Sequence, residues 1–409
     1  MRRSRNTRVL LIVAVLALVV VAGSVVAYRS RNVPHPEPTR IGTLTIYSSF
    51  ALTGPARASS MSIVNAITLA LEESGGRAGA FSIDYQSLND SDPSTQSWDA
   101  ALETANAKRA AADAAAIAYI GTSSSAATRV ALPILSQANL PMLSPTNRSG
   151  DLTKDPAAAA NYYPTGTRTF FRVVPSELAQ GTAAARWLRD LGRTRVFVID
   201  DGTAYGTSTA EAFVSAGPRT GLEIVARETA GRTAEFAALA QKVAASRSTA
   251  VLYAGLVDSR AADLVRQLRS TDARLTIVGL DGIACEEFLK QTGPAAEGTF
   301  AMFVGVPIDQ YAGAQRAWLD RYRARFASDP DLFAAYGYEA ARVLLAAIAL
   351  AGDRAVDRKA VTDALRKVGQ EYDGLFGRWS FDADGDTTAV THTGIVARGG
   401  RWAFAKILN

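Results

Sequence analysis

Cysteine and histidine are scarce in this sequence, which limits the sites it can build. The 409 residues include one cysteine, Cys285, and two histidines, His35 and His392. A lone cysteine cannot form a disulfide within the chain, and we interpret Cys285 as a small buried apolar side chain. Because histidine and cysteine form no cluster, we expect neither a zinc nor a transition-metal site, and no cofactor.

An evenly spread basic charge is also missing. The formal net charge is +5, but the first 40 residues hold seven arginines and one acid, a net charge of +6. Residues 41–409 therefore carry −1, the difference between these two values. A nearly neutral folded part does not offer the basic surface that nucleic acids require, so we expect no nucleic-acid partner.

One long apolar run stands near the N-terminus, at residues 9–27, after four arginines. About 20 apolar residues span a bilayer and the basic flank stays in the cytoplasm, which predicts an extracytoplasmic location, periplasmic or at the cell surface, for the rest. A cleaved signal peptide and an uncleaved membrane anchor both fit; we favour the anchor, because the run is long and Arg29 and Arg31 follow it. Residues 29–40 read as a proline-rich linker.

From residue 41 onward, short apolar segments alternate with segments of helical periodicity. Strands are expected at 44–50, 81–88, 116–121, 140–145, 170–175, 195–200, 222–227, 250–255 and 275–280, and helices at 61–73, 97–116, 125–138, 177–191, 207–216, 235–245, 259–269, 312–326, 336–350 and 358–368. Such alternation predicts parallel sheets covered by helices on both faces. Two series of this kind indicate an α/β protein with two doubly wound lobes, and residues 377–408 read as hairpin strands at a sheet edge.

Ligands of open α/β sheets bind beyond the carboxyl ends of the strands, so the loops there are the candidate site. The loop Gly121–Ser125 follows a strand and opens a helix, and its three serines stand where free backbone N–H groups suit a carboxylate. Plain capping of the helix by one serine is the alternative.

The same loops lack the motifs of common enzymes. None contains GxSxG, GxxxxGK[ST] or GxGxxG, and no histidine stands near a serine-rich loop to act as a base. Residues 382, 384 and 386 are aspartates spaced like the start of a calcium loop, but Thr387 stands in place of the required glycine and Thr393 in place of the final acid. We therefore expect a polar turn at residues 382–386. Because the catalytic motifs are absent from the loops, we do not expect the protein to be an enzyme.

Several segments together resemble a known family. They are SSFALTGP at 48–55, IGTSSSAATRVALPILSQANLPMLSPTNRSGDLT at 120–153, FFRVVPSELAQGTAAARWL at 170–188, VFVIDDGTAYG at 196–206, GLDGIACEEFL at 279–289 and SFDADGD at 380–386. In this order they are similar to the type I periplasmic-binding-protein family, and most of all to the substrate-binding component of branched-chain amino acid ABC transporters. The resemblance implies two lobes joined by three crossovers near residues 174, 308 and 373, with the ligand between them. With residues 1–40 as anchor or signal peptide plus linker, the first lobe would comprise residues 41–173 and 309–372. The second lobe would comprise residues 174–308 and 373–409.

The resemblance also implies roles for single residues. Ser124 and Ser125 match the positions that hold a ligand carboxylate, and Thr146 matches a position that offers its backbone carbonyl. Tyr205 matches a tyrosine that covers the ligand, and Asp281 matches the acid that takes its ammonium.

Two positions depart from the family's pattern. Arg148 stands where serine or threonine is usual, and it either points to solvent or reaches into the cleft, where its planar fork would hold a carboxylate. The family's frequent tyrosine is absent from the loop 255–258, which reads Gly-Leu-Val-Asp. If Arg148 enters the cleft, a simple organic acid or a ligand with an extra acidic group is favoured over leucine-like solutes.

These patterns predict a solute-binding protein that captures an amino acid, or a related small acid or amide, and delivers it to an ABC-type permease in the membrane. A ligand-sensing subunit of a signalling receptor complex is the alternative.

The N-terminal pattern leads to a direct test. Because residues 41–409 are expected outside the cytoplasmic membrane, protease added to spheroplasts should digest them while a cytoplasmic marker stays intact. Complete protection behind an intact inner membrane would contradict the predicted location.

Overall fold

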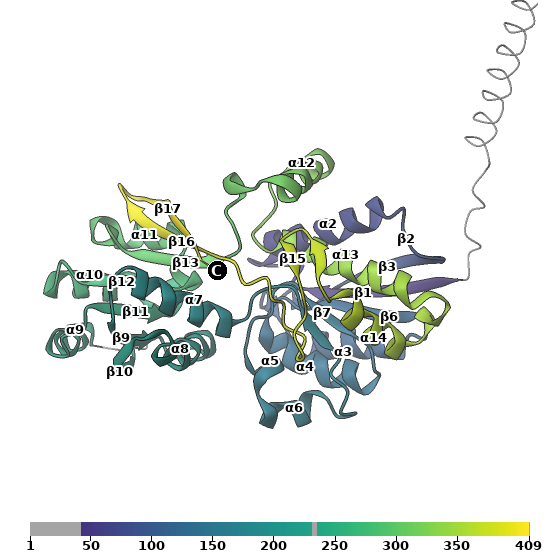
Figure 1. Cartoon of the computed structure of the whole chain (residues 1–409), viewed down its shortest axis with the longest axis horizontal. Helices are drawn as coiled ribbons and strands as arrows, with labels where there is room; N and C mark the ends of the chain where they lie inside the picture. Colours follow the sequence, from purple (N-terminus) through teal and green to yellow (C-terminus); the bar gives the residue numbers. More distant parts are fainter. Residues whose placement is uncertain (1–41, 231–234, 409) are drawn as a thin grey trace, which may run out of the picture. The chain divides into compact units, whose positions relative to one another are not determined.

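The computed structural model describes residues 42–230 and 235–408. Contacts divide the chain into residues 1–41 and a compact unit, 42–409, most of whose helices and strands are labelled in Figure 1. The predicted anchor or signal peptide falls outside the described residues. One described helical stretch, Ala334–Val356, is long and apolar enough to cross a membrane, but 72% of its apolar window is buried, as in a core helix.

The first sheet has six strands and its helices cover both faces. Its order is β2 (Arg77–Ala78), β3 (Phe81–Asn89), β1 (Thr43–Phe50), β6 (Ala116–Gly121), β7 (Met142–Ser144) and β8 (Phe170–Arg172). All neighbours are parallel except β2 and β3. The surrounding helices are α2 (Arg57–Glu73), α3 (Ala100–Ala112), α4 (Ser125–Gln137), α5 (Asp151–Lys154), α6 (Pro156–Tyr162), α12 (Gly313–Phe326), α13 (Ala334–Ala351) and α14 (Arg358–Val368).

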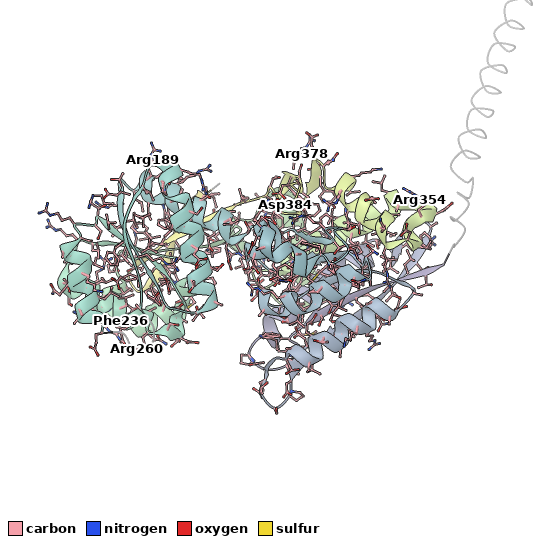
Figure 2. The ribbon with its side chains drawn as sticks, turned by 90° about the horizontal axis from the view of Figure 1, so that it is seen from below. Arg189, Phe236, Arg260, Arg354, Arg378 and Asp384 are labelled. Atoms are coloured by element: carbon pink, nitrogen blue, oxygen red, sulfur yellow. The ribbon has the colours of Figure 1, made fainter. Side chains whose placement is uncertain are left out.

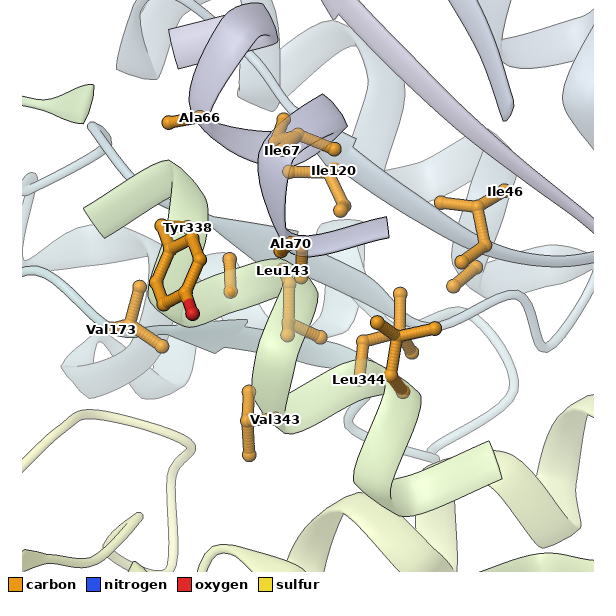
Figure 3. Packing of buried hydrophobic residues seen from close by; sticks show 14 of the residues in the cluster. Ile46, Ala66, Ile67, Ala70, Ile120, Leu143, Val173, Tyr338, Val343 and Leu344 are labelled. Atoms are coloured by element: carbon orange, nitrogen blue, oxygen red, sulfur yellow. The ribbon is translucent and has the colours of Figure 1, made fainter. Parts of the chain in front are cut away.

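Alternating side chains of the central strands divide this lobe's core in two. Ile46 of β1 and Ile120 of β6 pack in one cluster with α2 and α13, and Figure 3 shows Ile67 and Ala70 of α2 near Ile120. Tyr119 of β6 points to the other face, where the core is completed by buried residues of α3 and α4. This alternation follows from the two-residue period of a strand.

The second sheet has seven strands. Its order is β10 (Glu223–Thr229), β9 (Arg195–Asp200), β11 (Ala250–Ala254), β12 (Thr276–Gly279), β13 (Phe300–Val304), β16 (His392–Arg398) and β17 (Arg401–Leu408). The first five are parallel, and β13, β16 and β17 are joined antiparallel. Helices α7 (Glu177–Asp190) and α8 (Ala204–Ala216) pack on one face; α9 (Phe236–Ala245), α10 (Ala261–Thr271) and α11 (Glu286–Thr292) pack on the other. Figure 2 labels Phe236 and Arg260 where α9 and α10 meet, with the guanidinium 4.5 Å from the ring centre.

The predicted fold of two doubly wound α/β lobes is confirmed, and so is the C-terminal hairpin at a sheet edge. The main differences are local. Strand β13 and helix α11 were not predicted, and α5 and α6 occupy a stretch read as loop. The helix expected from residue 97 begins at 100, because Asp99 caps it by accepting from the N–H groups of Ala101 and Leu102, each at 2.9 Å.

The segment after residue 372 packs with the first lobe, although the family resemblance implies the second lobe from residue 373. Strands β14 (Tyr372–Gly374) and β15 (Gly377–Trp379) form a small hairpin that buries Leu375 and Trp379 in the first core. Glu339 of α13 holds both, since it accepts from the Leu375 N–H at 3.0 Å and from the Trp379 indole at 2.7 Å. The chain enters the second sheet only at His392. A second small sheet pairs β4 (Ser91–Asp92) with β5 (Ser97–Trp98).

The turn with three aspartates is held by side chains of the first lobe. Lys154 Nζ lies 2.6 Å from Asp382 and 2.7 Å from Asp384, which is labelled in Figure 2. The fully buried Arg172 donates from Nε to Asp386 at 2.6 Å. These carboxylates therefore have protein cations as partners, which agrees with a polar turn.

A buried acidic pair lies between the first sheet and α3. Glu103 accepts from the hydroxyls of Ser49 at 2.6 Å and Tyr119 at 2.8 Å, next to the carboxyl ends of β1 and β6. Asp90 is fully buried, and its carboxyl oxygens have no hydrogen-bond partner among the described residues. Burial raises the pKa of Glu103 to about 8, helped by the Asp90 charge, and raises the pKa of Asp90 to about 6.

This pair predicts a pH-dependent stability. Because the folded pKa of Glu103 lies above its ordinary 4.5, its protonated form stabilises the fold, and the free energy of unfolding should fall as pH rises from about 4.5 to about 8. At about 1.36 kcal/mol per pKa unit the loss is of the order of a few kcal/mol. Glu103→Gln, which stays neutral, should flatten this decline in denaturant unfolding, whereas Glu211→Gln on the surface should not. An equally steep decline in both variants would show that Glu103 is not responsible.

Candidate functional site

A cavity of about 280 Å³ lies between the two lobes, where loops at the carboxyl ends of both sheets meet. From the first lobe it is lined by Ala56, Ser59, Ser60, Ile63, Ser123, Ser125, Thr146, Arg148 and Phe333, and from the second by Glu177, Tyr205 and Asp281. Five of the six predicted site residues are among them. Ser124 is the exception.

The serines of the loop after β6 have different positions: one caps helix α4, and the other two line the cavity. Ser124 Oγ accepts from the Ala127 N–H at 3.2 Å and so caps α4, as the alternative interpretation had it. Ser123 and Ser125 line the cavity instead. Ser123 Oγ accepts from the Ala51 N–H at 2.8 Å, which ties this loop to the one after β1. The first N–H groups of α4 have no partner within the helix, and their dipoles favour an anion beside them.

Thr146 is positioned by the loop after β7. Its hydroxyl donates to the carbonyl of Thr122, and its N–H donates to Ser144 Oγ at 3.2 Å. The side chain therefore joins the loops that follow β6 and β7. Both loops belong to neighbouring parallel strands, which is why they reach the same edge of the sheet.

Arg148 crosses from the first lobe to the second. Its side chain is 7% exposed, so the interpretation that it points to solvent is wrong. Nε donates to the Pro175 carbonyl at 3.1 Å, Nη2 donates to Gln180 Oε1 at 2.7 Å, and Nη1 forms an ion pair with Asp281. The guanidinium thus enters the cleft, but three of its five N–H groups serve protein acceptors.

Asp281 is the centre of this network. Its Oδ2 accepts from Arg148, and its Oδ1 accepts from the Tyr205 hydroxyl and from Gln180 Nε2 at 3.1 Å. Tyr205 lies in the first turn of α8, which begins at Ala204 because Thr203 caps it. Burial alone would raise the pKa of Asp281, but the Arg148 cation and the donated hydrogen bonds hold that pKa below its ordinary value. The carboxylate is therefore ionised at neutral pH.

Glu177, at the start of α7, also lines the cavity and was not predicted. Its backbone N–H donates to the Arg148 carbonyl at 2.8 Å, and its carboxylate accepts from the Ser208 hydroxyl of α8. Burial raises its pKa. The sequence offered only an acid in the first turn of a helix, which is common at any helix start.

The apolar part of the site is a second cavity of about 460 Å³ that shares Tyr205, Asp281 and Phe333 with the first. Leu256, Gly282, Ala284, Phe303 and Leu332 complete its lining. Leu256 occupies the loop in which the family's frequent tyrosine is absent, and its side chain is 39% exposed. Phe303 was missed because the strand that carries it, β13, was not predicted.

A sequence profile of periplasmic binding proteins matches residues 39–400. This chain belongs to the periplasmic binding protein family. The match confirms the resemblance, and it places the folded lobes outside the cytoplasm, among proteins that bind solutes and are not enzymes. Anchoring by the N-terminal segment stays a prediction.

Several known proteins similar to this periplasmic binding protein are of the branched-chain amino acid type. The Leu/Ile/Val-binding protein BraC3 of Rhizobium johnstonii is 30% identical over 64% of this chain and 68% of its own length. A crystal structure of a putative branched-chain amino acid ABC transporter from Rhodospirillum rubrum is 26% identical, with a TM-score of 0.71 over 89% of this chain and all of that one. The LivJ substrate-binding protein of Streptococcus pneumoniae, solved with isoleucine, shares the fold with a TM-score of 0.67 at 23% identity over 90% of this chain and 99% of its own.

The different positions of two neighbouring serines give a matched test. Ser124→Ala removes a helix cap and should lower the free energy of unfolding by about 1 kcal/mol. Ser125→Ala leaves the cap intact and should instead weaken carboxylate binding about tenfold, as the loss of one hydrogen bond to a charged group implies. Urea unfolding and isothermal titration calorimetry would measure the two effects. The assignment is wrong if Ser125→Ala binds carboxylates as the wild type does.

Proposed function

We propose that this periplasmic binding protein captures a small organic solute between its lobes, an amino acid or a related small acid or amide, and delivers it to an ABC-type permease. The observation that carries the proposal is the composition of the cleft. Hydroxyl groups and the N-terminus of α4 lie on one side, an apolar wall lies on the other, and charged residues of both lobes meet between them. Such a mixture suits a solute with a polar head and an apolar body.

The size of the site supports a small ligand. The two adjoining cavities, about 280 and about 460 Å³, are in the range of small-molecule sites. We infer that the carboxylate or carbonyl end of the ligand lies near Ser125 and Thr146, and that its apolar part lies against Leu256 and Phe333. Leu256 stands on the second lobe and the other three residues stand on the first, so a ligand that touches both lobes favours the closed form over the open form.

Contacts made across the cleft support capture by closure. Arg148 of the first lobe reaches Gln180 and Asp281 of the second, and the Glu177 N–H donates to the Arg148 carbonyl. Opening the lobes would break these contacts together, which is typical of a hinge with two discrete states. Delivery to a permease rests on the likeness to proteins of branched-chain amino acid transporters.

Binding and closure are tested together on residues 41–409. Amino acids, their deaminated acids and small amides should be screened by thermal unfolding, because a ligand that binds only the folded state raises the melting temperature by mass action. A binding ligand should bind once per chain, remain chemically unchanged, and make small-angle scattering report a smaller radius of gyration. A screen without any binder, or turnover of the ligand, would contradict the proposal.

A further inference from the structure

The acid that resembles the family's ammonium acceptor already has a cation. Arg148 forms an ion pair with Asp281, and the guanidinium is fixed from two further directions by the Pro175 carbonyl and Gln180. The Asp281 side chain is 19% exposed and the Arg148 side chain 7%. The charge that a ligand ammonium would supply is therefore supplied by the protein itself.

A ligand ammonium could reach Asp281 only by displacing this guanidinium. Both carboxyl oxygens of Asp281 accept hydrogen bonds from protein groups, Oδ2 from Arg148 and Oδ1 from Tyr205 and Gln180. Displacement would leave the buried Arg148 without its counter-ion, and an unpaired buried charge is strongly unfavourable. A tethered cation also competes at a high effective concentration, because it pays no cost of association.

Glu177 is the remaining acid that faces the cavity. Its carboxyl accepts a hydrogen bond from the Ser208 hydroxyl, and the residue is only 8% exposed. Burial raises its pKa, and its carboxyl already has the Ser208 hydroxyl as a donor. Among the described residues that line the cavity, the ionisable groups are therefore the Arg148–Asp281 pair and Glu177.

The other end of the site keeps its preference for an anion. Ser123, Ser125 and Thr146 line the cavity next to the start of α4, where the free N–H groups of the helix favour an anion. The apolar wall of Leu256, Phe303 and Phe333 is available for a hydrocarbon body.

Building on the proposed function, we propose that Arg148 sets the ligand class: the solute is a monocarboxylate with an apolar body and no ammonium group. Arg148 acts as a built-in counter-ion that occupies Asp281. The protein then selects the deaminated acid over the amino acid of the same shape.

The test compares acids that differ only at the amino position. Leucine is titrated against isocaproate and α-ketoisocaproate, and phenylalanine against phenylpropionate and phenylpyruvate, by calorimetry with residues 41–409. The better deaminated acid of each set should bind at least about tenfold more tightly than the amino acid, the factor expected for one hydrogen bond to a charged group. An amino acid that binds more tightly than both of its deaminated partners, or an uncharged amide as the best ligand, overturns the inference.

Arg148→Ser supplies the decisive variant, because it frees Asp281. The preference should shift about tenfold or more toward the amino acid. Arg129→Ser is the matched control: Arg129 also pairs with an aspartate, Asp151, at 2.9 Å, but does not line this cavity, and the preference should stay as in the wild type. An unchanged preference in folded Arg148→Ser overturns the inference.

Asp281→Asn decides the matter if Arg148→Ser does not fold. Because the ammonium is not expected to touch Asp281, the ratio of the two affinities should stay within about threefold of the wild-type ratio, well below the tenfold of a charged hydrogen bond. A selective loss of leucine or phenylalanine affinity by tenfold or more would show that Asp281 receives the ammonium. That result would refute the proposed ligand class and leave the solute-binding function intact, whereas the absence of any binder in the wider screen would refute the function itself.

Discussion

The buried ion pair between Arg148 and Asp281 is the contact on which the candidate site depends. It joins a loop of the first sheet to a loop of the second, and Tyr205 and Gln180 complete its hydrogen bonds. A buried pair of this kind is a weak source of stability, because removing two charges from water costs nearly what their attraction returns. Its larger effect is on specificity, since it fixes which charges the cleft can still offer to a ligand.

Much of the fold could be predicted because strands and helices carry different periods. Strand β6 and helix α14 occupy the residues that the pattern indicated, and the order of the loops placed the site at the correct edge of both sheets. Strand β13 was not predicted from the sequence, because Phe300–Val304 lies between glycines and no helical pattern follows it directly. The segment after residue 372 was assigned to the other lobe because the family resemblance implies a crossover near residue 373, whereas Leu375 and Trp379 pack in the first core.

The sequence predicted which residues line the site better than it predicted which residues contact one another there. Five of six expected residues line one cavity, because each follows a strand of a parallel sheet. Ser124 and Ser125 are neighbours in sequence, yet the cap geometry of α4 gives them different tasks. The partner of Arg148 lies 133 residues further along the chain, and no local pattern specifies such a contact. Glu177 was missed for a similar reason, since its cavity position depends on how α7 meets the first lobe.

The carboxylate end and the charged pair together explain how this cleft could change ligands without changing its fold. In the proposed site the anion lies against hydroxyls and the N–H groups at the start of α4, which carry no net charge and are positioned by the loops after β6 and β7. Net charge in the cleft resides instead in a few side chains, Arg148, Asp281 and Glu177. One arginine, at a position where the family resemblance implies serine or threonine, alters that charge without being part of either sheet or of α4. The residues that select among solutes are thus different from the sheets and helices that form the cleft.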